Sequence, residues 1–499
     1  MRLAAKCFTV LVATWVCVSG RMIADTIPFE VLDPSLTVAT VIDENAGVAQ
    51  PIGIVFLAAD DFLVLEKATG QVKRVTGGIV HATPVLDLAV NSASERGLLS
   101  LVLHPDFPSP PFVYVRWTQS STGADTNVTL NVPLLGNRID RYVWNGTTLT
   151  FDKNLIEMRA LQQDNVPVPG HEGTQNAGNP AGNHNGGVMR FGPDKKLYVF
   201  MGDQGRRGWL QNLANGPFES EPLVDDNFGG GGPAPDDAHL SGMILRLNED
   251  GSAPEDNPFF AAGAGMGGEV GENIQKIFSY GHRNGFGMAF DPYSGSLWET
   301  ENGDDTFSEL NRVVPGMNGG WIQIMGPLSR FFDFKEIEVT QFGGALQQNR
   351  YPPTRLADAP GEARTRLVML PGAKYVDPEL SWKFESGPAG TTFVRGTALG
   401  EANDGTLWIG SSRSFGQVGG TGGSLYRLRL SQNRQKVDVS DPRIADRVID
   451  NLAKFEGTES ESLLVGRGFG TTPSIEQGPD GNLYVVSITD NRIYMISRK

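Results

Sequence analysis

One of only six histidines in the chain lies in a glycine-flanked turn before a short apolar segment. This histidine is His184, the glycines are Gly186 and Gly187, and the apolar segment is Leu197–Val199, which is followed by Asp203. A neutral imidazole has an unperturbed pKa of about 6.5, so it can accept a hydroxyl proton near neutral pH, and a nearby carboxylate would fix its tautomer. The spacing therefore predicts a general base, His184, oriented by Asp203.

A histidine in a turn more often has a structural role, so the prediction needs support from its surroundings. The two glycines after His184 allow a ligand to approach the backbone closely. A second polar cluster, Tyr-Gly-His-Arg-Asn at 280–284, lies at a comparable turn before a strand. We expect the two turns to face the same ligand.

The elements that must position these residues share a recurring phrase in the sequence. In this phrase, a Pro/Asn-Asp turn precedes an apolar strand that contains Tyr or Trp. It precedes segments 112–115, 197–199, 297–298, 407–409 and 483–486. Further strands are predicted at 243–247, 424–428 and 492–496. The copies lie roughly 75 to 110 residues apart, which is longer than a typical propeller blade and indicates long loops between strands.

We therefore predict an all-β chain folded as a six-bladed β-propeller with long inter-strand loops, with a degenerate blade at 55–75. Unrelated turns that share Pro, Asp and Gly are the alternative. The glycine- and proline-rich segments 227–235 and 261–268 have no periodicity and predict surface loops. The chain has 499 residues with 62 Gly and 31 Pro, which favours strands and turns.

The formal net charge is -15, with dispersed acidic residues. A nucleic-acid binder or a polybasic membrane-surface protein would need a clustered cationic face, so both classes are excluded and a small neutral ligand or a cation fits better.

The first residues have the pattern of an export signal, with Arg2 and Lys6 before an apolar run from Cys7 to Val18. We predict a signal peptide at 1–24, a single propeller domain at 25–499 and a secreted or periplasmic protein with no membrane span after cleavage. A retained anchor or an N-terminal strand is the alternative. Both cysteines, Cys7 and Cys17, lie in this segment, so the exported chain would contain no disulfide.

Several motifs in order resemble the glucose/sorbosone dehydrogenases, which are soluble quinoproteins with a six-bladed propeller. They are the stretch 184–203, Gly281 to Asn284, Gly97 to Leu99 before His104 to Phe107, and Glu309 to Asn311 with 315–316 and 320–321. The resemblance implies an exported oxidoreductase that uses pyrroloquinoline quinone (PQQ) and calcium. It would oxidise a hydroxyl of an aldose sugar or a related polyol or alcohol and pass electrons to a soluble acceptor.

The resemblance also implies roles for individual residues. His184 matches the general base, Asp203 its positioning acid, and Arg283 and Asn284 the residues that hold the quinone. Two further positions of the PQQ site hold different residues here: Glu95 stands where many members have Gln, and Asn183 stands where the family has an acid.

Two calcium positions are implied as well. Main-chain carbonyls of the turn that contains Gly303 and Asp304 match the calcium that bridges PQQ, while Glu309 and Gly319 match a second calcium. The acidic residues Glu301, Asp304, Asp305 and Glu309 supply the hard oxygen donors that calcium prefers. An acidic solvated loop is the alternative.

The chain departs from the family at three further positions. Val188 replaces the arginine that is usual after the two glycines. Thr471 and Pro473 replace an arginine pair that, in the family, holds the carboxylates of PQQ. Arg467, Arg413 or Arg395 are candidate substitutes from neighbouring loops. The departures favour one alternative function, a calcium-stabilised binding module that has lost PQQ, as in the hedgehog-interacting protein. A calcium-dependent lactonase would need a central cage of acids from several blades and ranks last.

Overall fold

The computed structural model describes residues 29–160, 184–204, 212, 240–303, 306–340, 357–384, 386–412, 423–450 and 458–499. The predicted signal peptide and the predicted loop at 227–235 lie outside these residues. No helix in the described part of the chain is long and apolar enough to cross a membrane.

The strands form six sheets, mostly with antiparallel neighbours. The first contains β3 (Pro51–Ala58), β4 (Asp61–Glu66), β5 (Gln71–Thr76), β6 (Ile79–Val80) and β7 (Leu86–Asp87). The second contains β8 (Leu98–Leu103), β9 (Phe112–Thr118), β10 (Asn137–Trp144) and β11 (Leu149–Met158). The third contains β12 (Met189–Phe191), β13 (Leu197–Met201), β14 (Met243–Leu247), β15 (Ile277–Tyr280), β19 (Met317–Asn318) and β20 (Lys374–Tyr375).

The other three sheets complete the chain. The fourth contains β16 (Gly285–Phe290), β17 (Leu297–Glu301), β18 (Thr306–Val313), β21 (Leu380–Phe384) and β25 (Val448–Ile449). The fifth contains β22 (Pro388–Phe393), β23 (Leu407–Ser411), β24 (Ser424–Leu428), β26 (Leu464–Arg467) and β1 (Glu30–Val31). The last contains β27 (Ser474–Gln477), β28 (Leu483–Ser487), β29 (Arg492–Arg498) and β2 (Leu36–Ile42), so the second strand of the chain pairs with the last strand.

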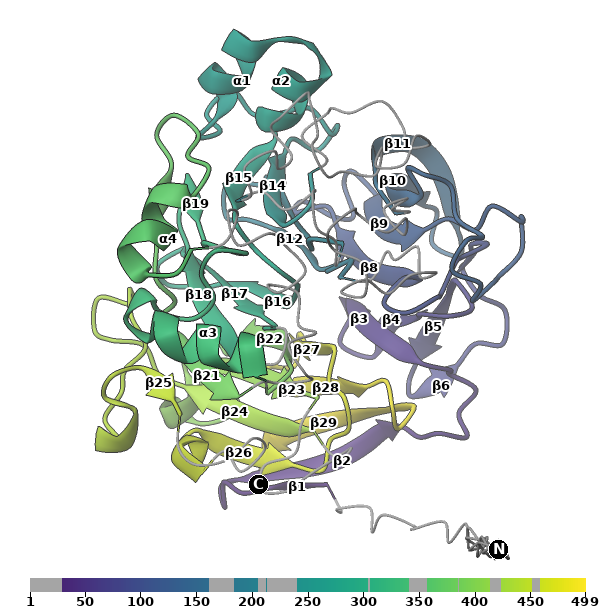
Figure 1. Cartoon of the computed structure of the whole chain (residues 1–499). Helices are drawn as coiled ribbons and strands as arrows, with labels where there is room; N and C mark the ends of the chain where they lie inside the picture. The colour runs from purple at the N-terminus through teal and green to yellow at the C-terminus, as the bar shows by residue number, and fades with distance from the viewer. Residues whose placement is uncertain are drawn as a thin grey trace, which may run out of the picture.

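The sheets are arranged around a common centre (Figure 1). One edge strand of each sheet contacts that of the next, in the cyclic order β3, β8, β12, β16, β22, β27 and back to β3. The predicted all-β class and the propeller arrangement are thereby confirmed. A closed ring places the edge strands of neighbouring sheets around one central hollow.

The recurring phrase of a turn followed by a strand occurs at the same place in five of the six sheets. Its strands are β9, β13, β17, β23 and β28, and each is the second strand of its sheet. In two copies the turn aspartate accepts a hydrogen bond from the strand tyrosine at 3.0 Å, Asp194 from Tyr198 and Asp480 from Tyr484. A buried hydroxyl needs such a partner, which explains why the phrase pairs Asp with Tyr. The predicted blade at 55–75 coincides with parts of β3, β4 and β5.

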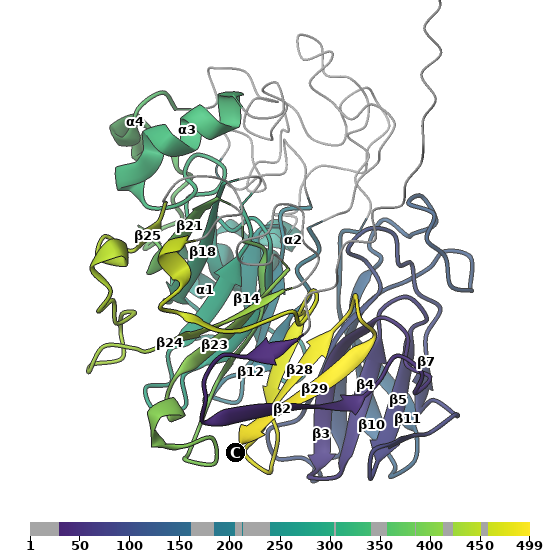
Figure 2. The ribbon, with the colours of Figure 1, turned by 90° about the horizontal axis from the view of Figure 1, so that it is seen from below.

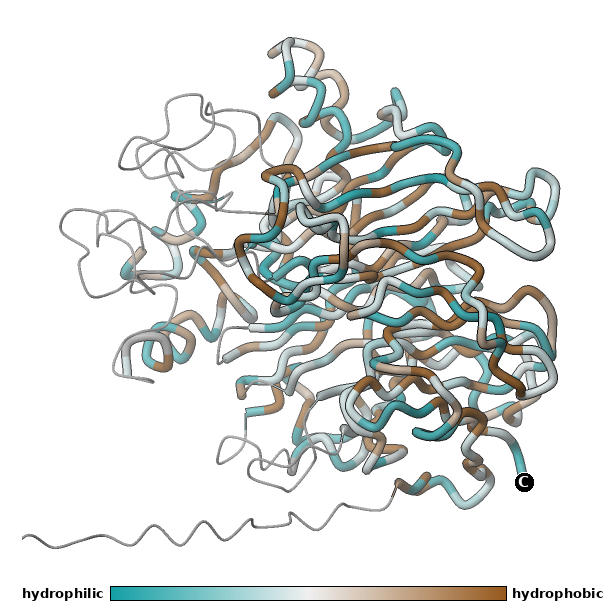
Figure 3. The backbone as a smooth tube through the Cα atoms, turned by 90° about the vertical axis from the view of Figure 1, so that its right-hand side faces the viewer, coloured by the Kyte–Doolittle hydropathy of each residue, from teal (hydrophilic) through white to brown (hydrophobic). Residues whose placement is uncertain are grey.

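The core lies between neighbouring sheets, where apolar residues follow the strands (Figure 3). All five residues of β13 and of β14 are buried. Such strands contain continuous apolar runs because both of their faces pack against neighbouring sheets.

Helices are few among the described residues. They are α1 (Phe260–Met266), α2 (Gly268–Ile274), α3 (Phe331–Thr340) and α4 (Pro360–Arg366), with single 3-10 turns η1 (Leu328–Arg330), η4 (Glu401–Asn403), η5 (Pro442–Ile444) and η6 (Thr458–Ser460). Helices α3 and α4 lie together on one side of the strands (Figure 2).

The prediction of a surface loop at 261–268 was wrong, because these residues form most of α1 and the start of α2. A side chain at Gly263 would place a Cβ 2.4 Å from the carbonyl oxygen of Gly271. The two short helices therefore pack backbone to backbone, a stabilisation that shows no apolar period in the sequence.

Candidate active site

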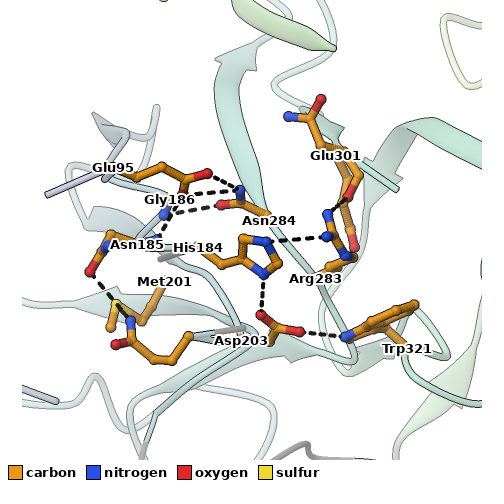
Figure 4. A network of polar contacts seen from close by, with 12 residues as sticks. Glu95, His184, Asn185, Gly186, Met201, Asp203, Arg283, Asn284, Glu301 and Trp321 are labelled. Atoms are coloured by element: carbon orange, nitrogen blue, oxygen red, sulfur yellow. Dashed lines mark hydrogen bonds and ion pairs between the residues drawn. The ribbon is translucent and has the colours of Figure 1, made fainter. Parts of the chain in front are cut away.

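The structure brings His184 and Asp203 together. His184 lies five residues before the start of β12, and Asp203 lies two residues after the end of β13, the hairpin partner of β12. The imidazole Nδ1 lies 2.7 Å from Oδ1 of Asp203, and both side chains are buried (Figure 4). A hairpin places its two ends side by side, which explains how residues 19 positions apart meet.

The hydrogen bonds assign the tautomer of His184. Arg283 Nη2 lies 3.1 Å from the imidazole Nε2, and a guanidinium can only donate. Nε2 therefore accepts, and Nδ1 holds the proton that it donates to Asp203. The other oxygen of Asp203 accepts a hydrogen bond from Trp321 Nε1 at 2.7 Å. The result is a neutral imidazole whose lone pair faces the arginine, the form that a general base requires.

The loop around His184 has an unusual backbone. His184 has a φ of +57°, which is uncommon for a residue other than glycine. A side chain at Gly202 would place a Cβ 2.1 Å from the carbonyl oxygen of His184. Glycine at 202 thus allows the end of β13 to touch the loop, so that Asp203 can reach the imidazole.

Two more predicted residues lie beside this pair. Asn284 Nδ2 lies 3.2 Å from both carboxylate oxygens of Glu95, and Asn284 Oδ1 accepts a hydrogen bond from the Gly186 amide at 3.3 Å. Glu95 also accepts a hydrogen bond from the amide of Asn185 at 3.2 Å. The amide side chain therefore ties the two predicted turns together. Asn183, the fourth predicted PQQ-binding residue, lies outside the described residues.

These residues line a cavity of about 490 Å³, a size typical of small-molecule sites. Its wall includes a residue from the inner strand of every sheet, namely Ile54, Leu101, Arg190, Phe286, Thr391 and Glu476. The cavity therefore occupies the centre of the ring. His184, Glu95, Arg283, Asn284 and Gly303 all line it.

The cavity wall contains cations that sequence reasoning missed. Arg190 lies 2.5 Å from Glu476, which neutralises its charge. Lys67 donates to the carbonyl oxygens of Ser92 and Ser94, and burial lowers its pKa, while nearby Glu95 raises it. In the sequence, the features that could have indicated these cations are a single Lys after an apolar strand and a single Arg after the two glycines.

The proposed substitutes for the missing arginine pair are not in the wall. Thr471 and Pro473 line the cavity as expected. In contrast, Arg467 forms an ion pair with Glu30, and the backbone amide of Arg395 binds Gln477; neither arginine is among the described lining residues. The expectation that these two arginines replace the missing pair was wrong, because Arg467 ends β26, far from the inner strand of its sheet, and Arg395 follows the end of β22. Arg413 lies outside the described residues.

The turn predicted to hold the first calcium binds Arg283. The guanidinium Nη1 donates to the carbonyl oxygens of Asn302 and Gly303, each at 2.8 Å. Each carbonyl oxygen has a second lone pair, which leaves it able to bind a cation on the side away from Arg283. Asp304 lies outside the described residues.

Glu309 does not line the cavity but joins a buried acidic cluster, Glu299, Glu301 and Glu309. Glu301 lies opposite Glu309 on neighbouring strands, and Asn311 Nδ2 donates to Glu299 at 2.8 Å and to Glu309 at 2.9 Å. Burial, together with the charge of Glu301, raises the pKa of both Glu299 and Glu309 well above the usual value. The cluster therefore needs protons or a cation.

The donors around this cluster fit a hard cation. Glu299 Oε2 and Asn311 Oδ1 are buried and have no hydrogen-bond partner among the described residues. His282 Nδ1 lies 3.0 Å from Glu301 and 3.6 Å from Glu299, and a Cβ at Gly319 would lie 3.6 Å from the same nitrogen. The predicted positions Glu309 and Gly319 thus lie at opposite parts of one buried site. Sequence reasoning missed Glu299, although its spacing of two from Glu301 places both on one face of β17.

Comparisons with known proteins place the chain in a family. The family model for glucose/sorbosone dehydrogenase matches residues 48–327. An uncharacterised protein from Synechocystis sp. is 27% identical over 468 residues, which cover 92% of this chain and 85% of that protein. Quinoprotein glucose dehydrogenase B from Acinetobacter calcoaceticus is 29% identical over 265 residues, 52% of this chain and 48% of the relative.

A solved structure has a similar fold. The PQQ-bound form of an aldose sugar dehydrogenase from Streptomyces coelicolor has a TM-score of 0.54 and 21% identity, covering 93% of this chain and 99% of that one. At this identity the likeness concerns the fold alone. The matched region spans about half the length of the quinoprotein relative.

Proposed function

Because this chain belongs to the glucose/sorbosone dehydrogenase family, we propose that it is a PQQ-dependent dehydrogenase that oxidises a hydroxyl of an aldose sugar or a related alcohol. We count each sheet of the ring as one blade of a six-bladed propeller. The observation that carries the proposal is the chain of contacts from Asp203 through His184 to Arg283 at the wall of the central cavity.

The residues of this chain would divide the work as follows. His184 Nε2 accepts the proton of the substrate hydroxyl, and Asp203 stabilises the imidazolium that forms. Arg283, held by the carbonyls of residues 302 and 303, supplies a fixed positive charge where negative charge develops. When bound, PQQ supplies the acceptor for the hydride that leaves the substrate carbon. Glu95 and Asn284 would hold the ring edge.

The cavity fits PQQ at one end. The His184 end provides Arg283 and the amide of Asn284, whereas Thr471 and Pro473 offer no positive charge to a molecule with three carboxylates. We propose that the protein retains PQQ and binds it weakly.

Introducing the missing cation should therefore strengthen binding. We expect Thr471→Arg to lower the Kd for PQQ by about 10-fold, since a charge-assisted hydrogen bond contributes roughly 1.5–3 kcal/mol. Fluorescence titration of the calcium-loaded protein measures this. Thr489→Arg is the matched control, because the Thr489 hydroxyl binds the Thr471 amide but Thr489 is not among the cavity-lining residues. An unchanged Kd for Thr471→Arg would show that position 471 does not face the cofactor.

We also propose calcium at both predicted places, the turn at Gly303 and the buried cluster at Glu309 with Gly319. The cluster predicts a pH-dependent effect of calcium. A carboxyl whose folded pKa lies above its unfolded value, here 4.5, adds stability at low pH and loses it as pH rises through the folded pKa. Metal-free protein should therefore lose stability toward alkaline pH, and calcium should offset the loss by binding the ionised carboxylates.

The measurement is the shift in Tm on adding calcium to chelator-treated protein. We expect a larger shift at pH 8 than at pH 5, and a smaller shift for Glu309→Gln. Glu362→Gln in α4, whose carboxylate pairs with Arg366 and lies outside the cluster, is the control and should show the same calcium-dependent shift as the parent protein. Equal shifts at both pH values would exclude calcium from the cluster.

The second candidate is a calcium-stabilised binding module that has lost PQQ, and the uncharged Thr471 and Pro473 favour it. Titration of purified apo-protein with PQQ in the presence of calcium separates the two. The dehydrogenase should develop a bound quinone spectrum and reduce a dye with an aldose. No spectral change and no dye reduction would leave the binding module.

We further propose that the protein is exported after removal of residues 1–24 and passes electrons to a soluble acceptor. The apolar run between Cys7 and Val18 supports export. N-terminal sequencing of the mature protein tests the cleavage.

A further inference from the structure

Arg116, in the middle of β9, is fully buried, with 0% of its surface exposed. It forms no ion pair with a carboxylate in the described part of the chain. Burial lowers its pKa to about 9, so it is still a cation at neutral pH. An unpaired buried charge is costly, and a strand of apolar residues would tolerate a leucine or methionine here at lower cost.

The hydrogen bonds of Arg116 reach across to the next sheet. Nη1 donates to the carbonyl oxygen of Phe200 at 2.5 Å, and Nη2 donates to that of Asn185 at 2.6 Å. Nη2 also lies 2.9 Å from the sulfur of Met201. One planar guanidinium therefore spans two separate segments, a geometry that lysine cannot reproduce.

Each of these segments ends in one member of the buried pair. Asn185 directly follows His184, and Met201 lies two residues before Asp203. The carbonyl of Asn185 belongs to a loop that contains left-handed backbone and lies outside the regular strands, and it accepts a hydrogen bond from a side-chain donor. Arg116 supplies that donor and ties the loop to the end of β13.

We propose that Arg116 is a positioning residue, which sets the separation of His184 and Asp203 by clamping the two segments that carry them. Its effect on turnover rests on the proposed dehydrogenase function, while its effect on the His184 to Asp203 hydrogen bond does not. A displacement of about 1 Å at a reacting group can cost 10²-fold in rate.

Three variants test the clamp. Arg116→Met keeps much of the length and removes all donors, and Arg116→Lys keeps the charge without the fork. Arg246→Met is the matched control, because Arg246 is also buried, lies at the far end of β14 and binds Asp194 and Asp256 instead. The readouts are the low-field proton resonance of His184 Nδ1–H in apo-protein, and kcat and KM of PQQ-loaded protein with an aldose.

For Arg116→Met we expect loss or a large shift of the resonance and a kcat about 100-fold lower, with KM changed by less than about 3-fold. Arg116→Lys should fall between this variant and the parent. Arg246→Met should lower Tm but keep the parent resonance and kcat.

A folded Arg116→Met with the parent resonance and kcat would overturn the proposal, as would a change in KM alone. If Arg116→Met does not fold, Arg116→Lys becomes the test of the proposal. A folded lysine variant with unchanged resonance and kcat would then overturn the proposal. If the parent protein shows no turnover, the dehydrogenase function fails, and the resonance of the variants still decides whether Arg116 positions the pair.

Discussion

Replacing His184 with Ala is expected to lower kcat with any aldose by about 10³-fold or more. A positioned general base typically contributes about 10²- to 10⁴-fold to the rate. The reason is geometric. The lone pair of His184 Nε2 lies at the cavity beside Arg283. The described cavity wall contains no second imidazole. PQQ binding should change little, because His184 acts on the substrate proton. Dye-coupled turnover and PQQ titration measure the two quantities.

The matched control for this variant is His104→Ala. His104 is also a buried histidine, but it pairs with Glu249 and lies outside the cavity wall. We expect it to keep the parent kcat. Turnover by His184→Ala at the parent rate would remove His184 from the mechanism.

Asp203→Asn is expected to lower kcat by about 10³- to 10⁴-fold through the tautomer, the size seen when a comparable aspartate is replaced by Asn in a serine protease. The Asn oxygen would accept the hydrogen bond of Trp321, which turns the Asn amide group toward His184 Nδ1. Nδ1 would then accept and Nε2 would hold the proton. The imidazole would lose the Nε2 lone pair that faces Arg283 and the cavity.

Trp321→Phe provides the comparison for Asp203→Asn. It removes the other hydrogen bond of Asp203 and leaves the carboxylate to fix the tautomer, so we expect less than about a 10-fold loss in kcat. Nitrogen NMR of labelled histidine reports the tautomer directly. Asp203→Asn protein with the proton still on Nδ1, or with parent turnover, would contradict this account.

The repeated turn phrase predicted much of the fold, because it encodes a local event. In two copies, Asp194 with Tyr198 and Asp480 with Tyr484, the aspartate of the turn accepts a hydrogen bond from the tyrosine of the strand that follows. The helices at 260–274 escaped prediction because close contacts between glycine backbones, rather than an apolar period, hold them.

The residues of the candidate site also fall into those that the sequence predicted and those that it did not. His184 and Asp203 were predictable because they flank one hairpin, and their contact follows from local chain geometry. Arg116 was not, because it comes from another sheet and acts through backbone carbonyls that the sequence does not mark. Its only signal was a charged residue inside an apolar strand. The prediction that Arg467 would line the cavity rested on its closeness in sequence to Thr471. Closeness in sequence does not fix the direction of a side chain, and that of Arg467 points to Glu30.

The most direct test of the central claim is a single-turnover experiment on protein loaded with PQQ and calcium. Parent protein and His184→Gln are each mixed with an aldose without oxygen, and the quinone absorbance is followed in time. We predict that the parent bleaches the quinone band rapidly, and that His184→Gln shows the bound band and keeps it. Equal bleaching by the two proteins, or a parent protein that binds the quinone and never reduces it with any aldose, would contradict the role of His184 as the base.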